Sequence, residues 1–185
     1  MLFLRINHFV ILTLLVVEHF CVLQLNFERS EIEFCNETYF KNFKLAIRKH
    51  SRGAKKTLNM SGKILKTLGT NVSIKISVQE YLHNEYKPTF IHFEFKWCEL
   101  LESPFMRLKE RFGLPCPTPP MEYILANITI STEPIPESFP LLEGRVYSRM
   151  FIRQPPIKIA SSYLYAKFIK VKHYNVFDSP TYWYL

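Results

Sequence analysis

The sequence predicts an all-β protein, an antiparallel immunoglobulin-like sandwich of about eight strands with one short helix in a disulfide loop. Downstream of residue 30, apolar and polar residues alternate with a period of two, which gives each segment one apolar face. Proline-rich pieces at 115–120, 134–140 and 155–156 cannot lie in central strands and separate these segments. The 185 residues are 48% hydrophobic and 15% aromatic, enough to bury one core.

The clearest strand is predicted over residues 71–79. Its apolar side chains alternate strictly with polar ones and share one face: Val72, Ile74, Ile76 and Val78. Residues 58–68 show the same alternation more weakly, and Gly69-Thr70 between the two segments is a turn signal. These two segments are therefore expected to form a β-hairpin.

A third strong strand is predicted over residues 90–97, where Ile91, Phe93, Phe95 and Trp97 share one face. Weaker alternation occurs at 43–47, 124–130, 146–152 and 163–171. Ile32 and Phe34 mark one further strand. About eight strands without βαβ alternation favour a sandwich.

One helix is predicted inside the loop closed by a Cys98–Cys116 disulfide. Ser103 and Pro104 are typical of an N-cap and a first helical position, and Gly113 is typical of a helix end. A disulfide that closes a loop of this length stabilises a fold by roughly 3 kcal/mol in the chain-entropy model.

Residues 1–25 are typical of a secretory signal peptide, residues 26–176 form the predicted sandwich domain, and residues 177–185 form a tail. The apolar run at 9–17 is shorter than the roughly 20 residues that a transmembrane helix needs, so no stable membrane span is expected. An uncleaved signal anchor is the alternative. Four glycosylation acceptor triplets follow the signal and agree with a secreted, extracellular protein; they begin at Asn36, Asn59, Asn71 and Asn127.

Catalytic and nucleic-acid motifs are absent from the sequence. No nucleophile elbow, zinc helix, phosphate loop or dinucleotide fingerprint occurs, and Asp178 is the only Asp. The histidines are scattered and are expected at the surface: His50, His83, His92 and His173. The cysteines lack zinc-ligand spacing. We therefore expect a binding protein, not an enzyme, without a cofactor or metal.

The formal net charge of +8 favours either an anionic partner or simple solubility. Nucleic acid is not expected as a partner, because the chain has no known nucleic-acid-binding motif and the predicted compartment is extracellular.

Five segments of the chain, taken in order, resemble landmarks of a large insect family of small secreted proteins. These are Asn71-Val-Ser-Ile-Lys-Ile, Glu85-Tyr-Lys-Pro88, Trp97-Cys-Glu-Leu-Leu101, Leu114-Pro-Cys-Pro117 and Phe139-Pro-Leu-Leu-Glu-Gly144. The family is mostly of unknown function and includes the CheA/CheB chemosensory proteins. The similarity covers about residues 34–168. One departure concerns cysteine: the family's second cysteine would fall near Phe43, which leaves Cys35 without that partner.

The resemblance implies a sandwich akin to the ML lipid-recognition superfamily, whose members hold lipid or sterol-like ligands between two sheets. It therefore predicts an apolar small molecule or lipid as the partner, with a cell-surface receptor as a further partner. The residues expected to line the cavity are Val72, Ile74, Ile76, Val78, Ile91, Phe93, Phe95 and Trp97, with Phe105 and Met106 at its mouth. Periodicity alone does not separate this interpretation from a solid core that the same residues fill.

Overall fold

The computed structural model describes residues 21–132, 135 and 143–172. Residues 1–20 of the predicted signal peptide and the predicted tail at 177–185 lie outside the described residues, as does His173. Residues 23–169 form one compact unit. Of the rest of the chain, only residues 21–22 and 170–172 are described near its ends.

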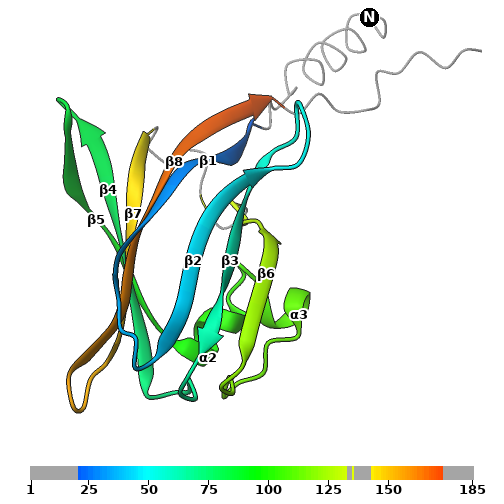
Figure 1. Ribbon diagram of the computed structural model, residues 1–185. Helices are drawn as coiled ribbons and strands as arrows, with labels where there is room; N and C mark the ends of the chain where they lie inside the picture. The colour runs from blue at the N-terminus through cyan, green and yellow to red at the C-terminus, as the bar shows by residue number, and fades with distance from the viewer. Residues whose placement is uncertain (1–20, 133–134, 136–142, 173–185) are drawn as a thin grey trace, which may run out of the picture. The chain divides into compact units, whose positions relative to one another are not determined.

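Two antiparallel sheets make up the compact unit (Figure 1). The five-stranded sheet has the order β1-β8-β7-β4-β5 and the three-stranded sheet the order β2-β3-β6. The strands of the first are β1 (Cys21–Cys35), β8 (Ile157–Lys172), β7 (Glu143–Ile152), β4 (Val72–Leu82) and β5 (Glu85–Lys96). Those of the second are β2 (Phe40–Lys49), β3 (Lys56–Ile64) and β6 (Glu122–Ile128). All eight segments predicted from alternation are strands, which confirms the fold class.

The predicted hairpin of residues 58–68 with 71–79 is wrong. Strand β3 pairs with β2 and β6, whereas β4 pairs with β5 and β7, so the two strands belong to different sheets. The backbone of Leu68 exchanges two hydrogen bonds with Thr118, at 2.8 and 3.0 Å. This bridge fastens the segment between β3 and β4 to the disulfide loop. The chain then crosses to the other sheet instead of turning back to pair with β3.

The β4–β5 hairpin closes through a two-residue turn that the sequence did not reveal. His83 and Asn84 both have positive φ angles, 51° and 65°, as a type I′ turn requires. His-Asn is a weak sequence signal for this turn, because asparagine or aspartate followed by glycine is the usual pair.

Two short helices connect β5 to β6 where one was predicted. They are α2 (Trp97–Glu102) and α3 (Leu108–Phe112). Ser103 ends α2 and does not begin a helix, because Pro104 after it holds Ser103 in an extended conformation (φ −60°, ψ 143°). Trp97 begins α2 and is not the last residue of a strand. Gly113 ends α3 as predicted, with a φ of 64°.

The disulfide between Cys98 and Cys116 is present, with the two Cα atoms 5.6 Å apart. It fastens α2 to the segment that leads into β6, and thereby holds α2 and α3 against the sandwich. Trp97 reinforces this attachment, because its indole N–H donates a buried hydrogen bond of 2.7 Å to Thr118 Oγ1. Cys35 is half-buried and free.

The core lies between the two sheets and continues under the helices. Its fully buried side chains include Leu68, Val72, Leu101, Ile128 and Ile159. Gly62 on β3 allows a close approach of the neighbouring strand, because a Cβ there would lie 3.0 Å from the backbone of Phe43. That contact falls at the register shift in β2.

Candidate functional site

An apolar cavity lies between the five-stranded sheet and the helical connection, with a volume of about 300 Å³. Strands β1, β4, β5, β7 and β8 supply one wall, and α2, the α2–α3 connection and the segment after β6 supply the other. The described residues that line it are Leu25, Ile76, Val78, Ile91, Phe93, Phe95, Leu100, Phe105, Met106, Ile130, Ile135, Gly144, Arg145, Val146, Ala166 and Phe168. No residue of β2, β3 or β6 lines it, so this cavity is not enclosed by the two sheets alone.

A second, smaller cavity of about 80 Å³ marks the space between the two sheets. Phe40, Met60 and Leu125 line it from the three-stranded sheet, and Met150 and Ala160 line it from the five-stranded sheet. Between the sheets the interior is therefore nearly filled by side chains. The larger apolar space opens where the five-stranded sheet faces the helices and not the small sheet.

Seven of the ten residues expected at a ligand cavity line the larger one: Ile76, Val78, Ile91, Phe93, Phe95, Phe105 and Met106. The other three lie elsewhere. Val72 and Ile74 are buried in the core toward the start of β4, where Ile152 and Met150 oppose them. Trp97 points toward Thr118 and lines the smaller cavity, because α2 begins there and the strand alternation stops.

We infer that the mouth of the cavity lies at the β5 edge of the sheet, because a lining side chain there reaches solvent. Phe93 is 43% exposed, and its ring contacts those of Phe95 and Phe105 with centroid distances of 6.2 Å each. Phe105 and Met106, the two residues expected at the mouth, are half-buried in the α2–α3 connection. Aromatic rings thus border the route from solvent to the interior.

Several lining residues carry no sequence signal that marks them as part of a ligand site. Leu25 was assigned to the signal peptide, yet it lies on β1, which begins at Cys21, and its side chain packs against the core. Val146 belongs only to a weak alternation, and Ala166 is not part of the apolar alternation of its strand. Ile135 lies in a proline-rich piece that offers no periodicity. Only the tertiary fold brings these segments to the wall formed by Ile76 and Phe95.

Arg145 is the one charged residue among the described lining residues, and its guanidinium is already engaged. Its Nε donates to Gln79 Oε1 at 2.6 Å, and the guanidinium lies between the rings of Tyr86 and Tyr163, 4.3 Å from each centroid. Strand alternation places the next residue, Val146, toward the cavity. The described lining therefore offers a ligand apolar surface without an uncommitted charge.

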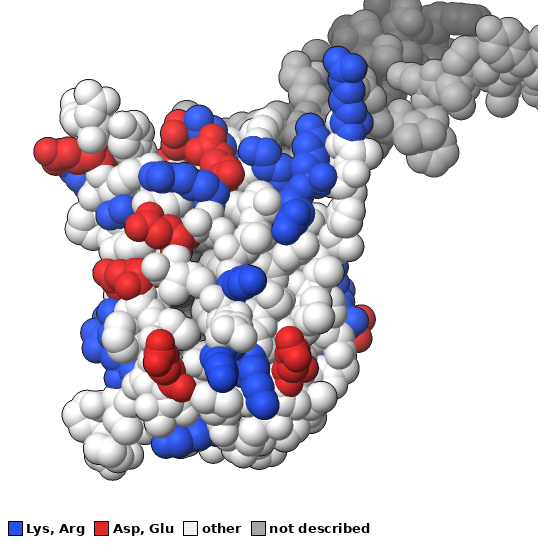
Figure 2. Space-filling model, viewed as in Figure 1, with Lys and Arg blue, Asp and Glu red and all other residues white. Residues whose placement is uncertain are grey.

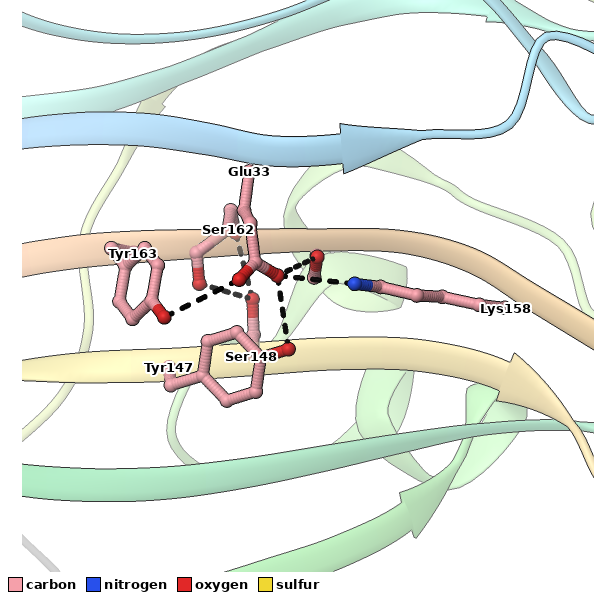
Figure 3. A network of polar contacts seen from close by, with 7 residues as sticks. Glu33, Tyr147, Ser148, Lys158, Ser162 and Tyr163 are labelled. Atoms are coloured by element: carbon pink, nitrogen blue, oxygen red, sulfur yellow. Dashed lines mark hydrogen bonds and ion pairs between the residues drawn. The ribbon is translucent and has the colours of Figure 1, made fainter. Parts of the chain in front are cut away.

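A polar network fastens β1 to β8 and β7 away from this cavity (Figure 3). The carboxylate of Glu33 accepts hydrogen bonds from Ser161 Oγ at 2.5 Å, Lys158 Nζ at 3.1 Å and the Tyr147 hydroxyl at 3.1 Å. The hydrogen bond from Ser161, followed by that from Lys158, lowers the pKa of Glu33 to about 2. This carboxylate stays ionised at neutral pH, so it cannot act as a general acid there.

The remaining candidate groups are dispersed. His50, His83 and His92 are exposed, and within the described ranges no three His, Cys, Asp or Glu side chains gather as a metal site would require. Burial, followed by the nearby charge of Glu37, raises the pKa of the Cys35 thiol, which disfavours the reactive thiolate. None of the helices in the described part of the chain is long and apolar enough to cross a membrane.

The four glycosylation acceptors differ in setting. Asn71 and Asn127 are exposed, and Asn36 and Asn59 are half-buried. Asn59 Oδ1 accepts a hydrogen bond of 2.9 Å from the Asn127 backbone N–H, so two of the acceptors lie side by side on the three-stranded sheet. Their glycosylation stays a prediction.

No protein-family model matches this chain, and no curated protein matches it.

Proposed function

We propose that this protein is a secreted carrier or co-receptor that binds an apolar small molecule in the cavity between the five-stranded sheet and the α2–α3 connection. The observation that carries the proposal is the cavity itself, about 300 Å³ in volume and walled almost entirely by aliphatic and aromatic side chains. This volume lies at the lower end of the range of about 300–1,000 Å³ that ligand pockets occupy. Ligand pockets are also typically lined by such side chains.

The mechanism is burial of apolar ligand surface. Each 100 Å² removed from water contributes about 2.5 kcal/mol, from which the cost of immobilising the ligand is subtracted. Because the guanidinium of Arg145 is committed to Gln79 and two tyrosine rings, the buried part of the ligand is uncharged hydrocarbon. A polar headgroup, if the ligand carries one, would lie at the mouth near Phe93 and Phe105. The resemblance to a chemosensory family adds pheromone-like hydrocarbons to the lipids that fit.

The direct test is mass spectrometry of apolar molecules extracted from the native protein, together with displacement of a fluorescent lipid probe. We expect a co-purifying apolar molecule and saturable probe binding. Two substitutions on β8 serve as a matched pair, because Ala166 lines the larger cavity and Ala160 the smaller one. Ala166→Phe should abolish probe binding, whereas Ala160→Phe should leave it unchanged in the molecules that remain folded. Absence of any ligand and of probe binding would overturn the proposal.

A second candidate is a protein-interaction module, favoured by exposed apolar side chains at the β4–β5 edge. Phe90 is 84% exposed, and Leu82 is 40% exposed on the same hairpin. Exposed aromatic side chains are typical anchors of protein interfaces. Under this alternative, Phe90→Ser should abolish receptor binding while probe binding is absent in both the parent and the variant.

A further inference from the structure

The positive charge of this protein is concentrated in one hairpin. The β2–β3 hairpin, residues 40–64, contains eight Lys and Arg residues and no Asp or Glu. These eight residues, called here the basic ribbon, are Lys41, Lys44, Arg48, Lys49, Arg52, Lys55, Lys56 and Lys63. Without them, the chain has 16 Lys and Arg against 16 Asp and Glu, so the whole formal net charge of +8 resides in the ribbon. A surface charge that serves only solubility is expected to be distributed over the molecule, with both signs interspersed.

The ribbon side chains are accessible, and among the described residues they form no ion pair. All are exposed except Lys56, which is half-buried. Figure 2 shows Lys and Arg side chains gathered over the turn between β2 and β3. A polyanion could therefore reach these side chains without first displacing an internal carboxylate.

The strand register places like charges directly opposite one another. Lys41 pairs with Lys63 near one end of the hairpin, and Lys49 pairs with Lys56 at the other. Directly opposed like charges destabilise a sheet, so a bound anion would relieve a repulsion that the fold otherwise retains. On β6, Glu122 lies opposite Lys63 and offsets part of the charge at the first end. The turn end, with Lys49, Arg52 and Lys55, has no such neighbour in the register.

The composition of the ribbon discriminates among anionic partners. Phe40 is buried, Phe43 is half-buried, and no Phe, Tyr or Trp occurs from Lys44 to Ile64, so the turn end lacks the stacking platforms that these side chains offer to single-stranded nucleic acids. Ala54 is the only apolar side chain in the turn at residues 50–55, which leaves nothing large to insert into a lipid bilayer. The positive charges follow the strands, and from Lys41 to Lys49 an extended strand covers roughly 26 Å. This arrangement suits a linear polyanion that has neither bases nor acyl chains.

We propose that the basic ribbon of the β2–β3 hairpin is a binding site for a linear sulfated polysaccharide, centred on the turn end. Sulfate groups would contact the Lys and Arg side chains, and release of their counterions would make the affinity fall with salt. An encounter with such a polysaccharide at a cell surface rests on the export proposed above. The binding capacity itself is independent of the ligand cavity, because no ribbon residue lines that cavity.

The test measures heparin binding by the full chain across a salt series. The variant Lys49→Gln/Arg52→Gln/Lys55→Gln removes three ribbon charges at the turn end. Its matched control, Lys75→Gln/Lys87→Gln/Arg149→Gln, removes three exposed charges from the five-stranded sheet. Both have the same net charge. We expect the ribbon variant to bind heparin about 10-fold or more weakly with a shallower salt dependence, and the control to lose less than about 3-fold.

Three results would overturn the proposal. Equal losses in both variants would show that net charge alone drives binding. Tighter binding to duplex DNA than to heparin at the same salt concentration would assign the ribbon to nucleic acid. Binding to phosphatidylserine vesicles without binding to heparin would assign it to membranes. Thermal melting and lipid-probe binding are measured on both variants, so a folding defect or a failure of the cavity proposal is distinguished from a failure of this one.

Discussion

The space between the two sheets and the space beneath the helices differ although they share strands β7 and β8. In the first, side chains from both sheets leave a cavity of about 80 Å³. In the second, the three-stranded sheet supplies no lining residue and about 300 Å³ stays open. Two facing sheets interdigitate their side chains, whereas a sheet facing two short helices and a connecting segment is covered less completely. We infer that the first region stabilises the fold and the second accommodates a ligand.

The largest expected difference between the two regions concerns two isoleucines on one segment. Ile128 is fully buried on β6, and Ile130 lines the larger cavity two residues later. Ile128→Ala should lower the free energy of unfolding by about 2–5 kcal/mol, because it creates a void in a packed interior. Ile130→Ala should cost less than half as much and should weaken probe binding. Urea denaturation of both variants measures the contrast, and equal costs would argue against an open second region.

Removal of the disulfide tests whether the cavity requires the wall formed by α2 and the α2–α3 connection. Replacing both Cys98 and Cys116 by Ala should lower the free energy of unfolding by roughly 3 kcal/mol in the chain-entropy model. It should also weaken probe binding, because the bridge fastens α2 to the segment before β6. The control is Cys35→Ala, which removes a cysteine without a bridge. Unchanged probe binding in the folded double variant would mean that the wall does not depend on the disulfide.

Filling the smaller cavity should lower stability, whereas filling the larger cavity should block ligand binding at little cost in stability. A cavity of about 150 Å³ accommodates a benzene ring, so a phenyl group fits the larger space and not the smaller one. Ala160→Phe should therefore cost about 1–3 kcal/mol through overpacking. Ala166→Phe should cost less than about 1 kcal/mol while blocking the ligand. Thermal denaturation provides the measurement, and the reverse order of costs would contradict the comparison.

The smallest expected effect concerns the Glu33 network, which fastens the sheet that both regions share. The pKa of Glu33 is lowered from 4.5 to about 2 in the folded protein. Its stabilising contribution is therefore present above about pH 4.5 and is lost as the pH falls toward 2. The side chain is 38% exposed, so solvent screening limits the contribution to about 0–1 kcal/mol. Glu33→Gln should be less stable than the parent at pH 7 and equally stable near pH 2; a constant difference across this range would contradict the assignment.

The sequence predicted strands better than it predicted their partners. Alternation such as that of Val72 to Val78 follows from one buried face, and this physical cause is local. Pairing is not local: Gly69-Thr70 resembles a hairpin turn, yet the Leu68–Thr118 bridge sends β4 to the other sheet. Likewise Ser103-Pro104 resembles a helix start, and Pro104 instead keeps Ser103 extended at the end of α2.

For the candidate site, the sequence indicated the wall that lies on β4 and β5 but not the opposite wall. The apolar periodicity of the sequence identified Ile76 and Phe95, because they lie on strongly alternating strands. Leu100 and Ile135 come from a helix and an irregular segment, where no sequence pattern indicates that they face the sheet. Ile130 ends the weak alternation at 124–130, but it lies beyond the last residue of β6. The same limit applies to the basic ribbon, whose residues are spread over 23 positions and come together only when β2 pairs with β3.

Methyl NMR during titration with a medium-chain alkane tests the central claim most directly, because it reports on both regions in one experiment. Saturable shifts are expected for Ile76, Ile91 and Ile130, which line the larger cavity, while Leu58, Leu68 and Ile128 in the packed core keep their positions. Shifts in neither set, or equally large shifts in both, would contradict the account of one filled and one ligand-accepting region.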